Sequence, residues 1–389
     1  MHPYLRAILL LSCTALVSSF CSNSALHFSR ARRSLNSNIE MRGTRGDSLP
    51  YPARFAVLGG GSFGLALTTV LARKNIPTTV LVRKQEVADS INKNRTHPVY
   101  LKGVTLPTGF TATTDPQEAL ADATFLVHAI PVQHTRSFLM NHRQYFPPGA
   151  PILSLSKGIE CGTLQLMEGI FEDVLGTDRA LAFMSGPSFA REMALNQETA
   201  VVIASRDNEL ALDLAEILSG ETYRCYTTKD VVGLEVGGAC KNVVALAAGM
   251  CEGLGLGTNA KAGLVTRGCN EATRLAVKMG GKASTLGGLS GVGDTFATCF
   301  GPLSRNRKFG ERLGKGETME QILASSTEVA EGVETAFALR DLIYQVDKSY
   351  RVDLKYPILL GVARVLEGKI TPYQGLKNFM AIPIRDENI

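Results

Sequence analysis

A lysine within an apolar helical run is the first candidate for chemistry in this sequence. Lys241 lies in residues 238–249, where Asn242 is its only polar neighbour among Gly, Ala, Cys, Val and Leu. Burial disfavours the charged ammonium and lowers the pKa of lysine toward the range in which the amine accepts and returns protons. A lysine on such a helix could also extend its ammonium to solvent and have no role. The motifs that accompany Lys241 therefore decide its interpretation.

A glycine motif early in the chain predicts a dinucleotide site. Residues 59–64 read Gly-Gly-Gly-Ser-Phe-Gly, a G-x-G-x-x-G pattern between an apolar strand and a helix. Gly59 permits the tight turn, Gly61 lets the backbone approach a pyrophosphate, and Gly64 lets the helix pack on the strand. The helix N-terminus then offers N–H donors to the phosphates. The predicted contacts to NAD(H) or NADP(H) are Gly59, Gly61, Ser62, Phe63 and Gly64, the alternative being a merely tight turn.

The end of the second strand bears on the choice of cofactor. An acidic residue there would bind the ribose 2′-hydroxyl of NAD and repel a 2′-phosphate. The sequence instead has Arg83 followed by Lys84. Two cations at this position tolerate or favour NADP(H) through charge-assisted hydrogen bonds, unless Arg83 is only a solvated surface cation.

Strand signals alternate with helical stretches up to about residue 229. The apolar, β-branched runs are 54–59, 78–83, 123–130, 151–155, 181–184 and 199–204. Continuous apolar strands between helices predict a parallel sheet that is covered on both faces. Beyond residue 229 only helical stretches follow, separated by glycine-rich connections. We predict a Rossmann-type doubly wound α/β domain at 51–228 and an all-helical domain at 229–389.

Composition argues against several classes of protein. The 389 residues carry a net charge of +5, but six arginines against two acidic residues place +4 of it in the first 50 residues. The other 339 residues carry only +1, so nucleic acid is not an expected partner. The eight cysteines include no C-x-x-C pair and no histidine at metal-ligand spacing. We therefore expect neither a disulfide framework nor a metal site.

Several segments in the same order resemble the soluble bacterial and plastid type of NAD(P)-dependent glycerol-3-phosphate dehydrogenase. The segments are 156–158, 186–190, 238–249, 291–307 and 329–332, and the likeness covers residues 54–370. The sequence departs from the family pattern in having Cys240 before the lysine and Gly60 as an added glycine. Neither residue carries a reacting group.

The resemblance implies hydride transfer between NAD(P)H and a small molecule, interconverting dihydroxyacetone phosphate and sn-glycerol 3-phosphate for glycerolipid backbones. It also implies a homodimer and a helical domain like that of 6-phosphogluconate dehydrogenase. No stable membrane insertion is expected, because the one apolar run of interest, near the N-terminus, is too short to span a membrane. Lys241 corresponds to the proton acceptor, Lys157 contacts both substrate and cofactor, and Asp294 hydrogen-bonds an ammonium or a substrate hydroxyl. The implied substrate contacts are Lys157, Gly186, Ser188, Lys241, Asn242, Asp294, Thr298, Ser304, Arg305 and Asn306. The implied cofactor contacts, with Arg83, are Lys157, Ala190, Arg305, Val329 and Glu331.

Some neighbouring residues are expected to have no role in chemistry. No histidine lies in the matching segments, so a histidine base is not predicted. Arg307 and Lys308 are expected to be solvated neighbours of Arg305, and Cys299 a packed thiol. Two alternative functions are a related 3-hydroxyacid-type dehydrogenase, which needs a carboxylate pocket, and a non-catalytic protein that senses NAD(P)H.

Residues 1–50 read as a targeting leader. A short segment ending at Arg6 precedes the apolar run 7–17, which is too short to span a membrane, and small residues before Phe20 are typical of a signal cleavage site. Residues 21–46 are rich in Ser, Arg and Asn, as in transit peptides. A signal followed by a transit-like tract resembles the bipartite leaders of secondary plastids. The alternatives are a mitochondrial presequence, simple secretion, or a cytosolic protein.

Overall fold

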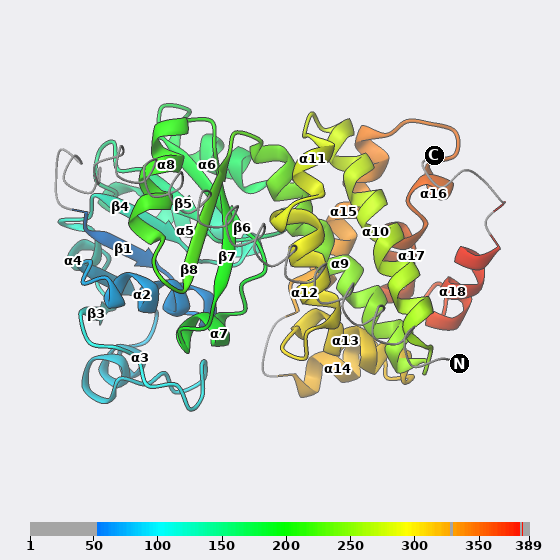
Figure 1. Cartoon of the computed structure of the whole chain (residues 1–389), viewed down its shortest axis with the longest axis horizontal. Coiled ribbons are helices and arrows are strands. Elements are labelled where there is room, and N and C mark those ends of the chain that lie inside the picture. The colour runs from blue at the N-terminus through cyan, green and yellow to red at the C-terminus, as the bar shows by residue number, and fades with distance from the viewer. Residues whose placement is uncertain (1–52, 327–329, 382, 384–389) are drawn as a thin grey trace, which may run out of the picture. The chain divides into compact units, whose positions relative to one another are not determined.

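The computed structural model, which describes residues 53–326, 330–381 and 383, contains one sheet of eight strands (Figure 1). The strands are β1 (Phe55–Leu58), β2 (Thr78–Leu81), β3 (Phe110–Thr113), β4 (Phe125–His128), β5 (Ile152–Ser154), β6 (Leu181–Ser185), β7 (Thr199–Ser205) and β8 (Tyr223–Thr228). Their order across the sheet is β3-β2-β1-β4-β5-β6-β7-β8. The chain winds to one side of β1 and then to the other, which confirms the predicted doubly wound sheet and places its switch point between β1 and β4.

The last two strands correct the expectation of an all-parallel sheet. The strands β1 to β6 are parallel, but β7 pairs antiparallel with β6, and β8 runs parallel to β7. The connection from β6 to β7 contains only the short helix α7 (Ala190–Ala194) and re-enters the sheet from the edge at which β6 ends. The helix α8 (Asn208–Leu218) then crosses the sheet, so β8 runs beside β7 in the same direction.

The sequence analysis missed β3 and β8, and these are the two edge strands of the sheet. An edge strand has a partner on one side only and tolerates polar side chains. Burial alternates along β8, where Tyr223 and Cys225 are buried while Arg224 and Tyr226 are exposed. Such strands lack the continuous apolar run by which the central strands were predicted.

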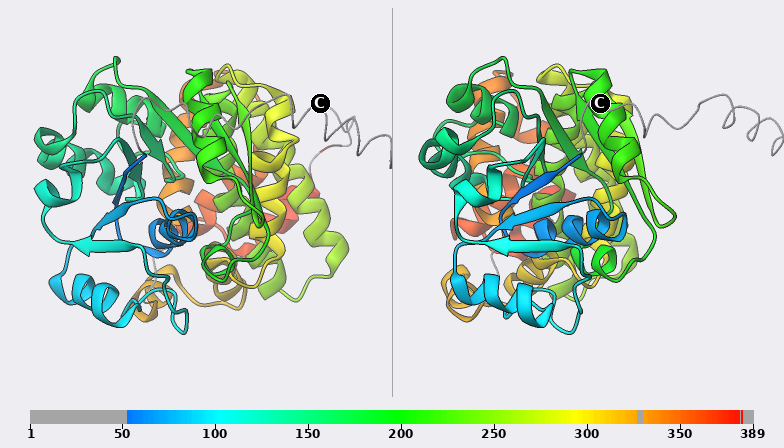
Figure 2. Two further views of the ribbon diagram at one scale, coloured as in Figure 1. Left: turned by 60° about the vertical axis from the view of Figure 1, so that its left-hand side comes forward. Right: turned by 90° about the vertical axis from the view of Figure 1, so that its left-hand side faces the viewer.

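Helices cover both faces of the sheet (Figure 2). Alternate residues of β1 point to opposite faces, so Phe55 and Val57 join one apolar cluster while Ala56 and Leu58 join another. The first cluster includes α2 (Ser62–Arg73) and α8, and the second includes α5 (Val132–His142) and α6 (Met167–Leu175). The remaining short elements of this region are α3 (Gln85–Asp89), a π-helical turn (Ser90–Asn94), α4 (Pro116–Leu120) and a 3₁₀ turn (Arg143–Tyr145).

The part of the chain described after β8 is helical, with α9 (Val231–Gly253) as its buried centre. The other helices are α10 (Thr258–Lys278), α11 (Ala283–Leu286), α12 (Asp294–Phe300), α13 (Arg305–Gly314), α14 (Met319–Ser325), α15 (Gly332–Val346), α16 (Val352–Lys355), α17 (Pro357–Leu366) and α18 (Pro372–Met380), with a π-helical turn at Leu289–Gly293. Asp230 caps α9 by accepting a hydrogen bond from the N–H of Gly233 at 2.9 Å. By length and composition α9 could cross a membrane, but 89% of its most apolar window is buried inside the protein, as in a core helix.

Glycines bring α9 and α13 into backbone contact. A Cβ on Gly249 would overlap the carbonyl oxygen of Arg307, and a Cβ on Gly310 would overlap that of Leu246. A Cβ on Gly253 or on Gly314 would likewise overlap a backbone carbonyl oxygen of the other helix. Without side chains at these crossing points the two helices approach closely, which places the N-terminus of α13 beside the middle of α9.

Candidate active site

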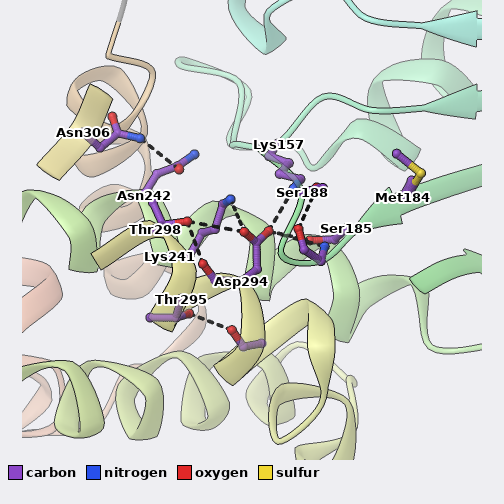
Figure 3. A network of polar contacts seen from close by, with 12 residues as sticks. Lys157, Met184, Ser185, Ser188, Lys241, Asn242, Asp294, Thr295, Thr298 and Asn306 are labelled. Atoms are coloured by element: carbon purple, nitrogen blue, oxygen red, sulfur yellow. Dashed lines mark hydrogen bonds and ion pairs between the residues drawn. The ribbon is translucent and has the colours of Figure 1, made fainter. Parts of the chain in front are cut away.

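Three charged side chains from distant parts of the sequence meet between the sheet and the helices (Figure 3). Lys241 extends from α9, Lys157 follows β5, and Asp294 begins α12. The Nζ of Lys241 lies 2.5 Å from Oδ1 of Asp294, and the Nζ of Lys157 lies 2.8 Å from Oδ2. The side chains of the two lysines are 11% and 13% exposed, and that of Asp294 is 3% exposed. One buried carboxylate therefore bridges two amines.

The carboxylate of Asp294 is fixed by further donors. The hydroxyl of Ser185 and the N–H of Gly186, at the carboxyl end of β6, donate to Oδ2 at 3.3 and 3.4 Å. The hydroxyl of Thr298 donates to the backbone carbonyl of Asp294 at 2.6 Å and lies 3.3 Å from Oδ1. The hydroxyl of Thr298, a predicted substrate contact, is thus hydrogen-bonded to Asp294 in this structure. Asp294 itself has the predicted hydrogen bonds to ammonium groups.

Burial and charge act in opposite directions on Lys241. Desolvation lowers the pKa of Lys241, the carboxylate of Asp294 raises it and the like charge of Lys157 lowers it, which together leave it at about 8. Burial alone would raise the pKa of Asp294, but the two lysines together outweigh it and hold that pKa below its ordinary value. Asp294 is therefore ionised near neutral pH, while the amine of Lys241 can hold or release its proton.

A second polar corner is built from α9 and α13. The side-chain amide of Asn306 donates to Oδ1 of Asn242 at 2.9 Å and accepts a hydrogen bond from the N–H of Gly332 at 3.0 Å. Ser304 caps α13 by accepting from the N–H of Arg307. Arg305 is exposed on the first turn, so its guanidinium and the helix N-terminus together can bind an anion.

The glycine motif leaves space for a phosphate group. Gly59 has φ +114°, and a Cβ there would lie 2.7 Å from the carbonyl oxygen of Ala129. A Cβ on Gly64 would overlap the carbonyl oxygen of Gly59, whereas a Cβ on Gly61 would meet no atom within 4 Å. Gly61 is thus open at the N-terminus of α2, as a bound pyrophosphate requires. Gly60 is also needed, because its Cβ would lie 2.5 Å from Val82.

Lys157 links this motif to the amine cluster. Its Nζ lies over the ring of Phe63, 5.5 Å from the centroid, while it also reaches Asp294. Ser62 begins α2 beside Phe63. Arg83 and Lys84 are exposed just beyond β2, and Lys84 pairs with Glu86 at 3.1 Å.

The remaining predicted contacts are Gly186, Ser188, Ala190, Glu331 and Val329. Gly186 lies beside Asp294, and the hydroxyl of Ser188 donates to the Gly186 carbonyl at 2.8 Å. Ala190 begins α7, which places it near this loop but without a polar side chain. Burial raises the pKa of Glu331, which precedes α15, while its charge interacts with Arg305, Lys241 and Lys157. Val329 lies outside the described residues.

The prediction that Arg307 is a solvated neighbour was wrong. Its side chain is 9% exposed and pairs with Glu252 at 2.8 Å and Glu311 at 3.1 Å. Glu252 comes from the end of α9, so this ion pair joins α9 to α13. Lys308 is exposed and Cys299 is buried, as predicted. Desolvation raises the pKa of the Cys299 thiol, which makes it a poor nucleophile.

Comparisons with known proteins match both halves of the chain. Residues 54–211 match the N-terminal, and residues 230–377 the C-terminal, family model of NAD-dependent glycerol-3-phosphate dehydrogenase. The chloroplastic glycerol-3-phosphate dehydrogenase [NAD(+)] 2 of Arabidopsis thaliana is 43% identical over 344 residues, covering 88% of this chain and 80% of the relative. The glycerol-3-phosphate dehydrogenase [NAD(P)+] of Thermobifida fusca is 42% identical, and the match covers 86% of this chain and 98% of the relative. The crystal structure of the Coxiella burnetii glycerol-3-phosphate dehydrogenase has a TM-score of 0.79 at 31% identity and covers 85% of this chain and all of that one.

Proposed function

Because the chain belongs to the family of NAD-dependent glycerol-3-phosphate dehydrogenases, we propose that it interconverts dihydroxyacetone phosphate and sn-glycerol 3-phosphate with NAD(H) or NADP(H). The observation that carries this proposal is the buried amine of Lys241 on the carboxylate of Asp294. The nicotinamide, when bound, supplies or accepts the hydride at C2 of the substrate.

In the reducing direction, protonated Lys241 gives a proton from Nζ to the ketone oxygen as that oxygen becomes an alcohol. In the oxidising direction the neutral amine takes the hydroxyl proton. Asp294 holds the amine in place in both directions, and Lys157 favours loss of the proton through its like charge. Asn242, beside Lys241 on α9, offers an amide group to a substrate hydroxyl.

The corner at the start of α13 is proposed to bind the substrate phosphate. Ser304, Arg305 and Asn306 bring a hydroxyl, a guanidinium and an amide to a helix N-terminus. This combination suits a phosphate dianion. Arg305 and Glu331 are also proposed to contact the cofactor.

The proposal is tested by mixing the purified protein with dihydroxyacetone phosphate and following oxidation of NADH and NADPH. Turnover is expected. Turnover of a 3-hydroxy acid in place of the triose phosphate would favour the alternative dehydrogenase, and cofactor binding without turnover of either substrate would favour a sensor.

The pH dependence of the two directions is expected to be opposite. Oxidation of glycerol 3-phosphate needs neutral Lys241, so its kcat/KM should rise with pH and level off above about 8. Reduction needs the protonated amine, so its rate should fall as pH rises through the same value. Initial rates in both directions across the pH range check this, and parallel profiles would contradict it.

Arg83 is expected to set the tolerance for NADPH. Replacing Arg83 with alanine should raise KM for NADPH on the order of 10-fold and leave KM for NADH nearly unchanged, because a charge-assisted bond to the 2′-phosphate is lost. Lys93→Ala is the matched control, since Lys93 is an exposed lysine of the same region that pairs with Asp89. An equal increase in KM for NADPH and for NADH would show that Arg83 does not contact the 2′-phosphate.

We also propose that the enzyme works as a homodimer in a plastid and supplies glycerolipid backbones there. The predicted leader comprises residues 1–50, which lie outside the described residues. Chloroplastic relatives from Arabidopsis thaliana and Oryza sativa support a plastid. The mature N-terminus of the native protein is the deciding measurement for import: a start between residues 40 and 50 is expected, and an intact Met1 would contradict import. Light scattering of the purified enzyme tests the dimer.

A further inference from the structure

The loop that carries Lys157 is held by side chains of β4 and α5. The side-chain amide of Gln133 donates to the carbonyl of Ile159 at 2.9 Å and accepts from the N–H of Cys161 at 2.9 Å. The N–H and the oxygen of this one side-chain amide thus both hydrogen-bond to the backbone just after Lys157. Between these two residues, the buried carboxylate of Glu160 pairs with Arg136 at 2.8 Å.

A second anchor lies just before Lys157. The hydroxyl of Ser156 donates to the carbonyl of Ile130 at 2.5 Å and lies 3.1 Å from Nδ1 of His128. Because that hydroxyl proton is already used, the network assigns the imidazole proton to Nδ1 as the donor to Ser156. His128 is fully buried with its ring perpendicular to that of Phe171. Burial lowers the pKa of His128 to about 3, so the ring is neutral and keeps this hydrogen bond throughout the working pH range.

These anchors oppose an electrostatic force. Lys157 shares one carboxylate with Lys241, and two ammonium groups in a site with little water repel each other. A free loop could relieve the repulsion by turning Lys157 toward solvent. Anchors on both sides of Lys157 restrict that movement, and Gly158, with φ +145°, makes the turn between them.

We infer that Gln133 and the His128–Ser156 pair are positioning residues that hold Lys157 on the carboxylate of Asp294, which it shares with Lys241. This inference rests on the proposed function. The groups that face Lys241 are Asp294 on α12, Lys157 after β5, Glu331 before α15 and the neutral thiol of Cys299. If Lys157 moves away from Asp294, Lys241 loses its like-charged neighbour and becomes the one ammonium on the Asp294 carboxylate. Both changes favour the protonated amine.

The test is Gln133→Leu, which removes both hydrogen bonds at similar size, with Gln133→Glu and Ser156→Ala as further variants. For Gln133→Leu, kcat/KM for dihydroxyacetone phosphate should fall on the order of 10-fold. The pH at which glycerol 3-phosphate oxidation levels off should move upward. Gln133→Glu keeps the acceptor for Cys161 and should show a smaller change in the same direction. His134→Ala, exposed on the same helix, is the matched control and should resemble the wild type.

Each outcome separates the inference from the proposed function. An active wild type whose pH profile is unchanged in Gln133→Leu and Ser156→Ala would overturn the positioning role alone. A lower rate with an unmoved profile would also overturn it, because a general loss of packing lowers the rate without changing the charge around Lys241. A wild type that does not turn over the triose phosphate would overturn the proposed function.

Discussion

Replacing Lys241 with alanine is expected to lower kcat by on the order of 10²–10⁴-fold in both directions, the contribution typical of a positioned proton-transfer group. The amine is the buried group best placed to exchange a proton near pH 8, since Asp294 is ionised and held by donors. The same substitution should leave NADH affinity nearly intact, because the glycine motif lies elsewhere. Initial rates with dihydroxyacetone phosphate and with glycerol 3-phosphate, together with NADH titration, check both parts.

Lys241→Met distinguishes lost chemistry from lost packing. It keeps most of the volume on α9 and removes the amine, so its kcat should be as low as that of Lys241→Ala while its thermal unfolding stays close to wild type. Lys315→Ala, which replaces an exposed lysine just after α13, is the charge-matched control. Turnover close to wild type in Lys241→Met would remove Lys241 from the reaction.

The sequence predicts those features that depend on local pattern. The central strands are continuous apolar runs, and the glycines at 59–64 have spacing that only a phosphate-binding turn explains well. The edge strands β3 and β8 were not predicted, because polar residues interrupt their apolar pattern, although only one residue of β3 is exposed. Gly60 was taken as an extra glycine, but the side chain of Val82, just after β2, leaves no room for a Cβ there.

The site depends on contacts that no local pattern shows. Lys157 and Asp294 are 137 residues apart, and only the likeness to a known family paired them before the structure. Arg307 was misjudged because its partner Glu252 lies 55 residues away on α9. His128 lies within a strand, where a histidine has no sequence signature, and its bond to Ser156 appears only when β4 and β5 lie side by side.

The substitution Gly310→Ala is expected to lower the free energy of unfolding by about 3 kcal/mol, which is the upper end of the usual cost of adding a carbon to a packed core. The added methyl group would overlap the backbone carbonyl of Leu246, and a backbone atom within a buried helix cannot move aside as a side chain can. The two helices must then separate. Because the start of α13 carries Asn306 and the middle of α9 carries Asn242, separation breaks their hydrogen bond as well. Activity should therefore fall along with stability.

Gly263→Ala is the matched control for this prediction. Gly263 lies within α10, is exposed, and would place its Cβ in open space. Alanine favours a helix over glycine by about 0.5–1 kcal/mol, so this variant should be as stable as the wild type or slightly more stable. Thermal and denaturant unfolding of the two variants measure the contrast. Equal stabilities would mean that α9 and α13 tolerate a wider crossing, and the glycines would then not be what sets the distance between Lys241 and the anion-binding corner.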